Sequence, residues 1–461
     1  MALLNTGCLI STIQADVTGV TTGYAAECFV VLAAAVDAAT TDRCVTVPNS
    51  GSLGSLYPTQ TIPEGQLVFV DDVGVPVTAA SGKWIGLDGR GLRYDFPVST
   101  LWTWGCNATF SAGALGDETT TNRSSPGSVA GAGVTWCSVS MGYSTAALKN
   151  DNTLWTWGFN SAGSLGSGNS SQRSSPGTTA GGGTNWCFVS MARTGTHAAG
   201  IKTDGTLWTW GNNNCGQLGD GTITNRSSPG TVAGGGTNWC FVSTGQNSTA
   251  AIKTDGSLWT WGCNSSGELG NGTTTSRSSP GTVAGGGLTW CLVDVFRKHM
   301  IAIKADGTLW TWGYNNFGRL GDGTTTNRSS PGTTAGGGAT WCDASVGYYN
   351  GVAIKTDGTL WTWGYNFRGI LGTTSVTFRS SPGTVAGGGT TWKKAISNLE
   401  HVVALKTDGA LWAWGQNNVG QLGDGTTTCS SSPISINAGP ATWTKIAAGK
   451  ASSAGIKCSI C

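Results

Sequence analysis

The sequence contains few charged residues of either sign. Only 11% of its 461 residues are Asp, Glu, Lys or Arg, and the formal net charge is +2. A protein that binds nucleic acid through a basic face needs a concentration of Lys and Arg, so no nucleic-acid partner is expected. Long hydrophobic runs are also missing, because the apolar stretch Cys28–Val36 is too short to span a bilayer. We therefore expect no membrane insertion.

Histidine is almost absent as well. The three residues His197, His299 and His401 are 102 residues apart and each lies five residues before a Lys. A metal site needs ligands that converge, whereas equivalent positions of alternate repeats stay apart, so hydrogen bonding is the expected role and no metal is predicted. No Ser/His/Asp or Cys/His grouping stands out from the repeats. The sequence therefore predicts no catalytic residue, no cofactor and no enzymatic activity.

A secretory signal peptide is not recognisable, since Met1–Leu4 carries no basic residue and the first charged residue is Asp16.

The 14 Cys do not suggest a disulfide framework, because five of them follow the third Trp of a repeat. Equivalent positions in neighbouring repeats are generally too far apart for a disulfide, so these are expected to be buried free thiols. Six irregularly placed cysteines are candidates for pairing: Cys106, Cys215, Cys263, Cys429, Cys458 and Cys461.

Tryptophan and glycine are abundant instead. Of the 22 Trp, 21 recur three to a unit in seven units, each of which begins with Leu-Trp-Thr-Trp-Gly or a close variant. The segments are 53 residues apart twice and then 51 residues apart four times. Their tryptophan pairs are Trp102/Trp104, Trp155/Trp157, Trp208/Trp210, Trp259/Trp261, Trp310/Trp312, Trp361/Trp363 and Trp412/Trp414. Such a period indicates a repeat array, a solenoid or a propeller.

Each unit shows the same succession of parts. A strand-like Trp segment leads into a Gly- and Asn-rich loop, a polar arm with Ser-Ser-Pro, a third Trp and two further strands. An Asp-Gly hairpin such as Asp255-Gly256 then enters the next unit. The first Trp segment lacks a preceding strand, and the last strand, near Ala454–Lys457, lacks a following Trp segment. Pairing these two would close a ring, which predicts an all-β, seven-bladed β-propeller over residues 97–461.

Residues 1–96 are predicted to form a small separate α+β domain for attachment or oligomerisation. Helices are expected over Leu9–Val17 and Ala25–Thr40. A hairpin is expected between Leu67–Val70 and Val75–Thr78, with Pro76 placing the second strand at an edge, and Lys83–Leu87 is expected as a third strand.

The seven units resemble the regulator-of-chromosome-condensation repeat family, in the combination of Leu-Trp-Thr-Trp-Gly, Gly-x-Leu-Gly-Asp-Gly and Ser-Ser-Pro over residues 98–461. This resemblance implies a seven-bladed propeller. It also implies guanine-nucleotide exchange on a small GTPase, with chromatin binding. Exchange requires a projecting insertion, for which units of 51 to 53 residues leave no room, and chromatin binding favours a basic face.

The uniform Gly/Ser/Thr-rich repeats and the segments GQLVFVDDVGVPV and GKWIGLDGR also resemble virion appendage proteins of tailed bacteriophages. This second resemblance implies a non-enzymatic tail-fibre or adhesin protein on the virion, extracellular after assembly. Residues 1–96 would contact other virion proteins, or form a homo-oligomer, and the propeller loops would bind a host-surface glycan or protein. The alternative is a cytoplasmic protein-interaction scaffold, with nucleotide exchange ranked third.

Loops that vary on a constant scaffold are typical places for binding specificity. The aromatic residues of the variable loop differ between units and are the candidate receptor contacts: Phe110, Phe159, Tyr314, Phe317, Tyr365 and Phe367. Packing against a neighbouring loop is the alternative role.

Two sets of charged residues have competing interpretations. The repeated arginines, such as Arg226, either fix a loop or offer donors to an anionic partner, and Asp117, Asp220, Asp322 and Asp424 are weak candidates for Ca²⁺.

Overall fold

The computed structural model describes residues 98–108, 113–131, 135–181, 183–374, 377–436 and 442–459, together with the backbone of six strands between residues 23 and 86. The chain divides into two compact units, one containing Ser11–Val98 and the other Ser99–Ser459. None of the helices described is long and apolar enough to cross a bilayer.

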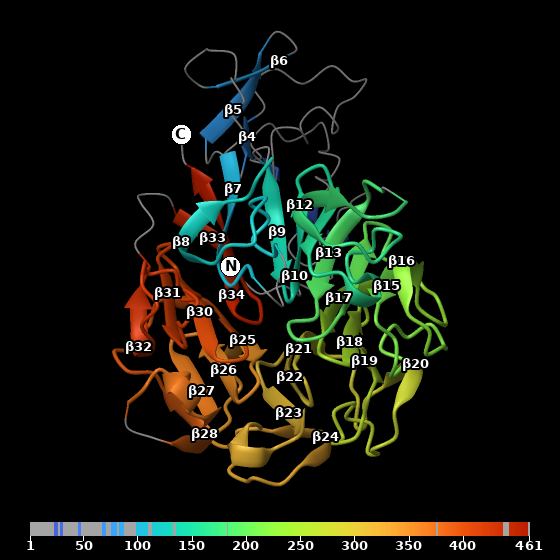
Figure 1. Cartoon of the computed structure of the whole chain (residues 1–461), viewed down its shortest axis with the longest axis vertical. Helices are drawn as coiled ribbons and strands as arrows, with labels where there is room; N and C mark the ends of the chain where they lie inside the picture. Colours follow the sequence, from blue (N-terminus) through green and yellow to red (C-terminus); the bar gives the residue numbers. More distant parts are fainter. Residues whose placement is uncertain are drawn as a thin grey trace. The chain divides into compact units, whose positions relative to one another are not determined.

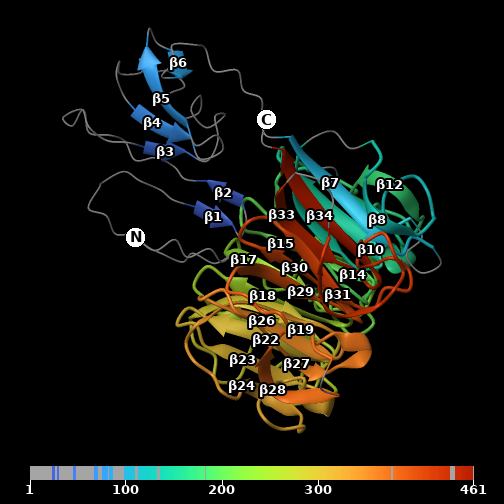
Figure 2. The ribbon, with the colours of Figure 1, turned by 90° about the vertical axis from the view of Figure 1, so that its left-hand side faces the viewer.

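Seven four-stranded antiparallel sheets form the larger unit and are the blades of a β-propeller (Figure 1). Blades 1 to 6 are β9–β12, β13–β16, β17–β20, β21–β24, β25–β28 and β29–β32, and blade 7 has the order β33-β34-β7-β8. β34 therefore lies beside β7, as expected from the two unmatched segments, and Figure 2 shows these strands side by side. The loop that follows β7 is bonded to the same end of the chain, since Cys106 N donates to Ala451 O at 2.8 Å.

The first strand of each blade begins at or next to the third Trp of a unit. Each of these strands contacts the first strand of the next blade, and the strand of blade 7 contacts that of blade 1, so together they surround the centre of the ring. They are β9 (Trp136–Met141), β13 (Trp186–Met191), β17 (Trp239–Thr244), β21 (Trp290–Val295), β25 (Trp341–Val346), β29 (Trp392–Ser397) and β33 (Thr442–Ala448).

The second and third strands of each blade are the buried middle of the sheet. The second strands are β10 (Ser144–Lys149), β14 (His197–Lys202), β18 (Ser248–Lys253), β22 (His299–Lys304), β26 (Asn350–Lys355), β30 (His401–Lys406) and β34 (Ser452–Ser459). The third strands carry the paired tryptophans and are β11 (Leu154–Gly158), β15 (Leu207–Gly211), β19 (Leu258–Gly262), β23 (Leu309–Gly313), β27 (Leu360–Tyr365), β31 (Leu411–Gly415) and β7 (Val98–Gly105).

The polar Ser-Ser-Pro arm is not a loop but the outer strand of every blade. A Pro within a strand is tolerated here because an edge strand needs ladder hydrogen bonds on one side only. These strands are β12 (Arg173–Thr178), β16 (Arg226–Thr231), β20 (Arg277–Thr282), β24 (Arg328–Thr333), β28 (Phe378–Thr384), β32 (Ser430–Ser435) and β8 (Arg123–Ser128). Short 3₁₀ turns, η1 (Ser161–Gly163), η2 (Asn316–Gly318) and η3 (Phe367–Gly369), lie in three of the loops before them.

Within residues 1–97 the described elements are strands: β1 (Gly23–Ala25), β2 (Cys28–Val30), β3 (Val45–Val47), β4 (Leu67–Val70), β5 (Val75–Ala80) and β6 (Lys83–Gly86). The helix predicted over Ala25–Thr40 is wrong at its start, where β1 pairs with β2 and Phe29 and Val30 favour a strand. The helix predicted over Leu9–Val17 lies outside the described residues. The predicted hairpin of β4 and β5 is confirmed. Its Pro76 does not mark an edge strand, because β6 pairs with the other side of β5 from Val77 onward.

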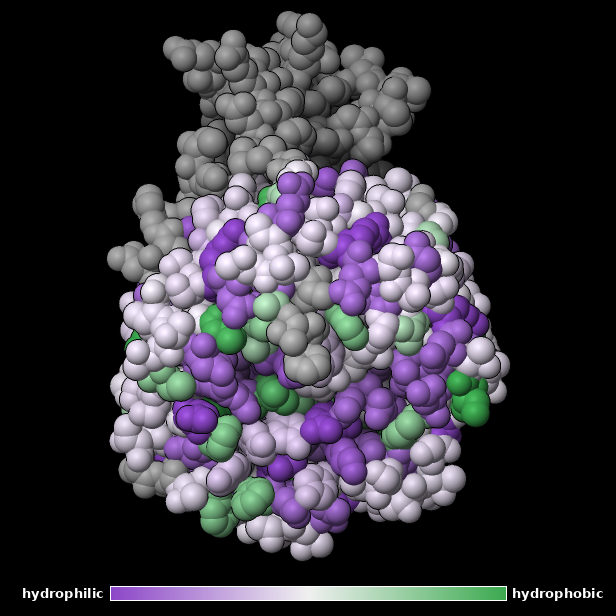
Figure 3. All heavy atoms as spheres, viewed as in Figure 1, coloured by the Kyte–Doolittle hydropathy of each residue, from purple (hydrophilic) through white to green (hydrophobic). Residues whose placement is uncertain are grey.

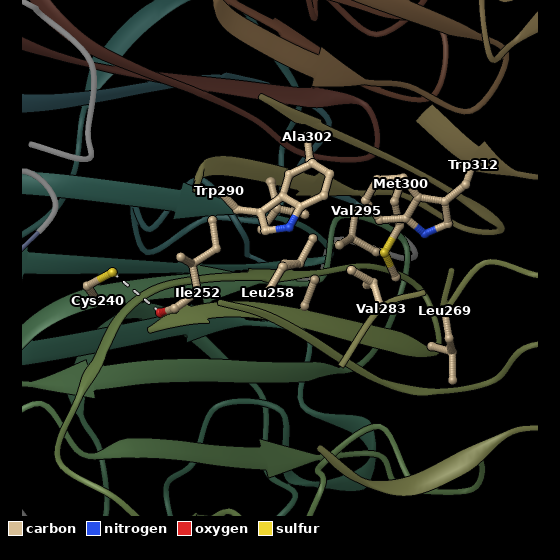
Figure 4. Close-up of a cluster of buried hydrophobic side chains, with 12 residues drawn as sticks. Cys240, Ile252, Leu258, Leu269, Val283, Trp290, Val295, Met300, Ala302 and Trp312 are labelled. Atoms are coloured by element: carbon tan, nitrogen blue, oxygen red, sulfur yellow. Dashed lines mark hydrogen bonds between the residues drawn. The ribbon is translucent and has the colours of Figure 1, made fainter. Parts of the chain in front are cut away.

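The hydrophobic core lies between neighbouring blades. One cluster joins Ile252 and Leu258 of blade 3 to Trp290, Met300 and Trp312 of blade 4 (Figure 4). The second Trp of every third strand is fully buried, and its indole Nε1 donates a hydrogen bond to a loop carbonyl of the preceding blade. The seven bonds measure 2.8–3.0 Å: Trp104–Gln421, Trp157–Ala114, Trp210–Ser164, Trp261–Gln217, Trp312–Glu268, Trp363–Arg319 and Trp414–Ile370. The bond from Trp104 to Gln421 joins blade 7 to blade 6.

The other two tryptophans of each blade hold a lysine. In blade 3, for example, the Nζ of Lys253 lies 4.8 Å from the ring centre of Trp239 and 4.4 Å from that of Trp259. The same arrangement recurs with the last Lys of each second strand: Lys149, Lys202, Lys304, Lys355, Lys406 and Lys457. The cation–π contact lets a charged side chain cover part of the apolar surface of the blade.

The three histidines are buried where second strands begin. His197 Nε2 lies 3.0 Å from Thr249 Oγ1 of the next blade, and His401 Nε2 lies 3.0 Å from Ser453 Oγ. The predicted hydrogen-bonding role is thus confirmed for these two residues. Burial lowers the pKa of His197 and His299 to about 3 and that of His401 to about 4.

The cysteines that follow the third Trp form no disulfide with the other described residues, as predicted; Cys187 and Cys240 are buried, but Cys137, Cys291 and Cys342 are partly exposed, contrary to the prediction. Cys187 Sγ, for example, donates to Ile201 O at 3.4 Å across the first two strands of its blade. Of the irregular cysteines, Cys215 and Cys263 form a disulfide that joins the loops of blades 2 and 3.

We predict that Gly270→Ala destabilises the propeller far more than Gly285→Ala. Both glycines have a positive φ, at +66° and +63°, but a Cβ on Gly270 would lie 2.6 Å from Trp312 Nε1, whereas none of the described atoms lies within 4 Å of one on Gly285. The backbone strain alone costs about 1 kcal/mol, and displacing the indole adds about 2 kcal/mol. Denaturant unfolding followed by Trp fluorescence measures both losses, and equal losses would contradict the proposed tightness of this contact.

We also predict a loss of stability as the pH falls from about 6.5 to about 4. The folded histidines are neutral because their pKa values lie below the unfolded value of about 6.5. Their stabilisation is complete above that value and falls by up to about 1.4 kcal/mol per pH unit for each histidine. The triple variant His197→Ser, His299→Ser, His401→Ser carries the residue found in this place at Ser144, Ser248 and Ser452. It should unfold with a flatter pH dependence, and an unchanged slope would refute the role of the histidines.

Candidate functional site

One face of the propeller carries the variable loops of all seven blades. It is formed by the turn between the first two strands of each blade and by the loop that follows the third strand. Both lie at the same end of the blade, because the first residue of a second strand pairs with the last Gly of the third strand, as His299 does with Gly313. We call this surface the loop face.

An Asn fixes the base of each loop, and it is buried in six of the seven loops, with Asn366 partly exposed. The Asn Oδ1 accepts the backbone N–H of the Leu that follows at 2.8–2.9 Å, and its Nδ2 donates to the far side of the same loop. The seven residues are Asn107, Asn160, Asn213, Asn264, Asn315, Asn366 and Asn417. This Asn follows the Trp-Gly pair by two residues in every unit, so its recurrence is visible in the sequence. The loops are therefore anchored at their bases, and their tips carry the differences between units.

Three of the six predicted contact residues come together on blades 4 and 5. Phe317 of η2 stacks on Tyr365 at the end of β27, with ring centres 4.7 Å apart, and Tyr365 stacks on Phe367 of η3 at 6.2 Å. Phe317 is 45% exposed. It has a left-handed backbone with φ of +62°, which is uncommon for a residue other than Gly, Asn or Asp, and Arg368 one unit later has φ of +57°.

The remaining predicted contacts lie elsewhere or in a different setting. Tyr314 is beside Phe317 in sequence, but its ring contacts the guanidinium of Arg319 at 4.9 Å. Phe159 belongs to blade 1, where it packs against Tyr143 at 6.0 Å. Phe110 lies outside the described residues. In Figure 3 the described apolar residues form small patches separated by hydrophilic surface.

Four further residues join this group and were not singled out from the sequence. Tyr349 lies 5.7 Å from Tyr365 and 5.5 Å from Phe367, and it contacts Tyr348 in the turn after β25. Arg319 and Arg297 pack on these tyrosines. Their signal in the sequence is a departure from the repeat: Gly-Arg-Leu-Gly replaces Gly-Gln-Leu-Gly, and two consecutive tyrosines occupy the turn after β25. We call Tyr314, Phe317, Tyr348, Tyr349, Tyr365, Phe367, Arg297 and Arg319 the aromatic surface.

A buried ion pair crosses the centre of the ring close to this surface. Arg193, from the turn after β13 of blade 2, pairs with Asp294 of blade 4. The same guanidinium donates to Val346 O of blade 5 at 3.0 Å and to Ser397 O of blade 6 at 2.6 Å. Its turn is longer than the others, with five residues between Met191 and His197, which accounts for the second 53-residue spacing. Arg193 therefore ties four blades together at the axis.

The repeated arginines of the outer strands are fixed within their own blades. Where the loop supplies an Asp, the arginine pairs with it, as Arg226 does with Asp220 at 2.8 Å and Arg123 with Asp117 at 2.7 Å. Where another residue replaces this Asp, the arginine donates a hydrogen bond to a carbonyl of its own strand. Arg277, for example, donates to Gly281 O at 3.1 Å. This geometry supports the loop-fixing role over an open ring of donors.

The loop carboxylates are likewise occupied by protein donors. Asp220 accepts hydrogen bonds from Asn213 Nδ2 and from the backbone and hydroxyl of Thr222 in addition to Arg226. Asp322 and Asp424 are bonded in a similar way. Among the residues that the structure describes, no group of three or more His, Cys, Asp or Glu is placed to hold a metal ion.

Curated relatives of this chain include proteins of plants and animals. It is 29% identical over 234 residues to the ultraviolet-B receptor UVR8 of Arabidopsis thaliana, which covers 50% of this chain and 53% of UVR8. It is also 29% identical over 249 residues to the human E3 ubiquitin-protein ligase HERC2, which covers 52% of this chain and 5% of HERC2. The matched region is thus about half of UVR8 and a small part of HERC2. These relatives favour the cellular alternative, and they give no support to the virion resemblance.

Solved structures agree with the fold. Yeast RCC1 (Prp20), in its complex with Kap60, superposes with a TM-score of 0.69 at 16% identity, covering 79% of this chain and 90% of that chain. Human WBSCR16 also gives a TM-score of 0.69, at 21% identity, covering 79% of this chain and 100% of that chain. At these identities the likeness shows the architecture alone.

Family comparisons identify the repeats themselves. Residues 98–394 match the RCC1-like domain, and residues 408–456 match the regulator of chromosome condensation (RCC1) repeat. The first match alone spans more than half of the chain. The chain therefore belongs to the family of RCC1-like β-propellers.

Proposed function

We propose that this propeller is a non-enzymatic interaction scaffold inside the cell, which binds a partner protein through the aromatic surface of blades 4 and 5. The observation that carries the proposal is the exposed stack of Phe317 on Tyr365, continued by Phe367 and Tyr349. Aromatic and Arg side chains are enriched at the centres of protein interfaces and dominate their binding energy.

The rest of the fold supports this role by holding the surface rigid. Phe317 and Tyr365 come from neighbouring blades, and these blades are joined by the bond from Trp363 Nε1 to Arg319 O at 2.8 Å. Rigid aromatic side chains lose little conformational freedom on binding, which favours affinity. The relatives support the proposal in a general way, since UVR8 and HERC2 carry this domain in a receptor and in a ligase of different overall activity.

Two weaker candidates remain for the same fold. Guanine-nucleotide exchange is less well supported, because the units have no insertion large enough to project toward a GTPase. A virion adhesin would use the same exposed aromatics to stack on sugar rings. Sugar binding is therefore one outcome of the binding experiment on the aromatic double variant.

We predict that the double variant Phe317→Asn, Tyr365→Ser loses binding to a partner while the fold is retained. Asn tolerates the left-handed backbone of residue 317, so the variant removes the aromatic contacts with little strain. At about 2 kcal/mol for one interface hot spot, Kd should rise about 30-fold. The matched control is Ile223→Ser, which removes a 67% exposed apolar side chain from a loop of blade 2.

The measurement has two steps. Proteins that co-purify with the wild-type chain are identified by mass spectrometry, and each candidate is then purified and titrated against the wild type, the double variant and the control. A partner that binds the double variant as tightly as the wild type would refute the proposal. Specific binding on a glycan array that the double variant loses would favour the adhesin instead.

A further inference from the structure

Arg319 occupies a place where three other units have a side chain that accepts a hydrogen bond. In this place Gln217 Oε1 accepts Cys215 N at 2.8 Å, Glu268 Oε2 accepts Ser266 N at 2.6 Å and Gln421 Oε1 accepts Val419 N at 3.0 Å. These bonds close the loop on itself. Arginine has donors only, so Arg319 cannot accept this hydrogen bond, and its side chain makes other contacts.

Tyrosines surround the guanidinium of Arg319. Its Cζ lies 4.9 Å from the ring centre of Tyr314, 5.4 Å from that of Tyr348 and 5.6 Å from that of Tyr349. The residue is only 7% exposed, and its Nε has no hydrogen-bond partner among the described residues. Burial also lowers the pKa of Arg319. The rings provide cation–π contacts, but they do not replace the hydrogen bonds that a buried guanidinium loses with water.

A second guanidinium packs on the same tyrosine. Arg297 Cζ lies 4.7 Å from the ring centre of Tyr348, and Arg297 Nε donates to the neutral Gln246. Within the described part of the chain, no carboxylate is within ion-pair distance of Arg319 or Arg297. The nearby Asp294 is already engaged with Arg193, Ser345 Oγ and Val346 N. Two cationic groups thus converge on one ring with no counter-ion from the described part of the chain, an arrangement that is costly in the free protein.

His299 lies in the same region, and one of its two ring nitrogens, Nε2, lacks a partner among the described residues. In blades 2 and 6 the equivalent histidine bonds to the hydroxyl of Thr249 or Ser453 on the next blade, but in blade 5 that place is taken by Gly351. His299 Nε2 is buried and unpaired among the described residues. Its pKa is lowered to about 3, mainly by burial and further by the positive charges of Arg319 and Arg193. The histidine therefore adds no positive charge, and the excess comes from the arginines.

We propose that Arg319 and Arg297, with the surrounding tyrosines, bind the carboxylate of an Asp or Glu side chain in a segment of the partner protein. This inference rests on the proposed function and names the kind of segment that the aromatic surface recognises. An Arg fork matches a carboxylate with two parallel hydrogen bonds, and such a pair is strongest where water is excluded. The neighbouring Phe317, Tyr365 and Phe367 would contact apolar residues that flank the acidic one.

The first test uses the full chain and a peptide array. Nine-residue peptides carry Glu at the centre with aromatic or aliphatic neighbours, and each has a matched version with Gln. We expect the Glu peptides to bind at least about tenfold more tightly, with a difference that shrinks as the salt concentration rises. A third version carries phosphoserine. Equal binding of Glu and Gln peptides would overturn the proposal, as would a preference for phosphoserine together with competition by inorganic phosphate.

Variants assign the effect to these arginines. Arg319→Met should abolish the preference for Glu and give an equal or higher Tm without peptide, because it removes a buried charge that lacks a counter-ion. Arg297→Met should weaken the preference for Glu. This variant provides the test if Arg319→Met fails to fold. The control Arg226→Met loses an arginine paired with Asp220 and should keep the full preference. Retention of the Glu preference in both Arg319→Met and Arg297→Met would refute the assignment.

The outcomes also separate this inference from the proposed function. If peptides bind and the Phe317→Asn, Tyr365→Ser variant loses them, but Glu and Gln peptides bind equally, the carboxylate site is refuted and the interaction surface stands. If the peptides show an Arg319-dependent preference for Glu that the aromatic double variant leaves unchanged, the carboxylate site stands and the aromatic surface is refuted.

Discussion

The hydrogen bond from a buried indole to the loop carbonyl of the preceding blade is the interaction on which the rest of this propeller depends. It occurs seven times, and the bond from Trp104 to Gln421 joins the two ends of the chain's repeat region. Each bond satisfies the one polar atom of a fully buried Trp, so the side chain contributes its large apolar area without leaving an unpaired donor. A glycine with positive φ, such as Gly270, allows the loop to approach the indole.

This constraint also explains why the loop face can vary without loss of the fold. The carbonyl that accepts the indole hydrogen bond belongs to the backbone. So does the Leu N–H that donates to the Asn at the base of the loop. This backbone is the same in every unit. The side chain at that position is free to be Gln217, Glu268, Arg319 or Ile370. Loops of this kind separate stability from recognition, because the scaffold residues and the variable residues are different positions of one repeat.

The arginines of this protein show how position decides the role of one residue type. In the outer strands, Arg123 and Arg226 pair with the Asp of their own loops and stabilise a single blade. At the axis, Arg193 joins four blades through Asp294 and backbone carbonyls. On blade 4, Arg297 and Arg319 are held by tyrosine rings, and no carboxylate of the described residues lies within ion-pair distance of them. A buried charge that is left uncompensated is more informative about binding than one that is paired.

The sequence by itself determined the number of blades, the hairpins and the joining of the two ends, because tryptophans, Asp-Gly turns and unmatched strands recur at fixed spacings. It did not reveal that the Ser-Ser-Pro arm is an outer strand, since Pro usually argues against a strand. It placed Phe317, Tyr365 and Phe367 in variable loops, but it missed Arg193, Arg297, Arg319 and the Tyr348–Tyr349 pair as their neighbours. Only the tertiary structure decided these contacts. Many of them join residues of different blades, and the repeat pattern specifies what each blade has in common rather than what two blades place side by side.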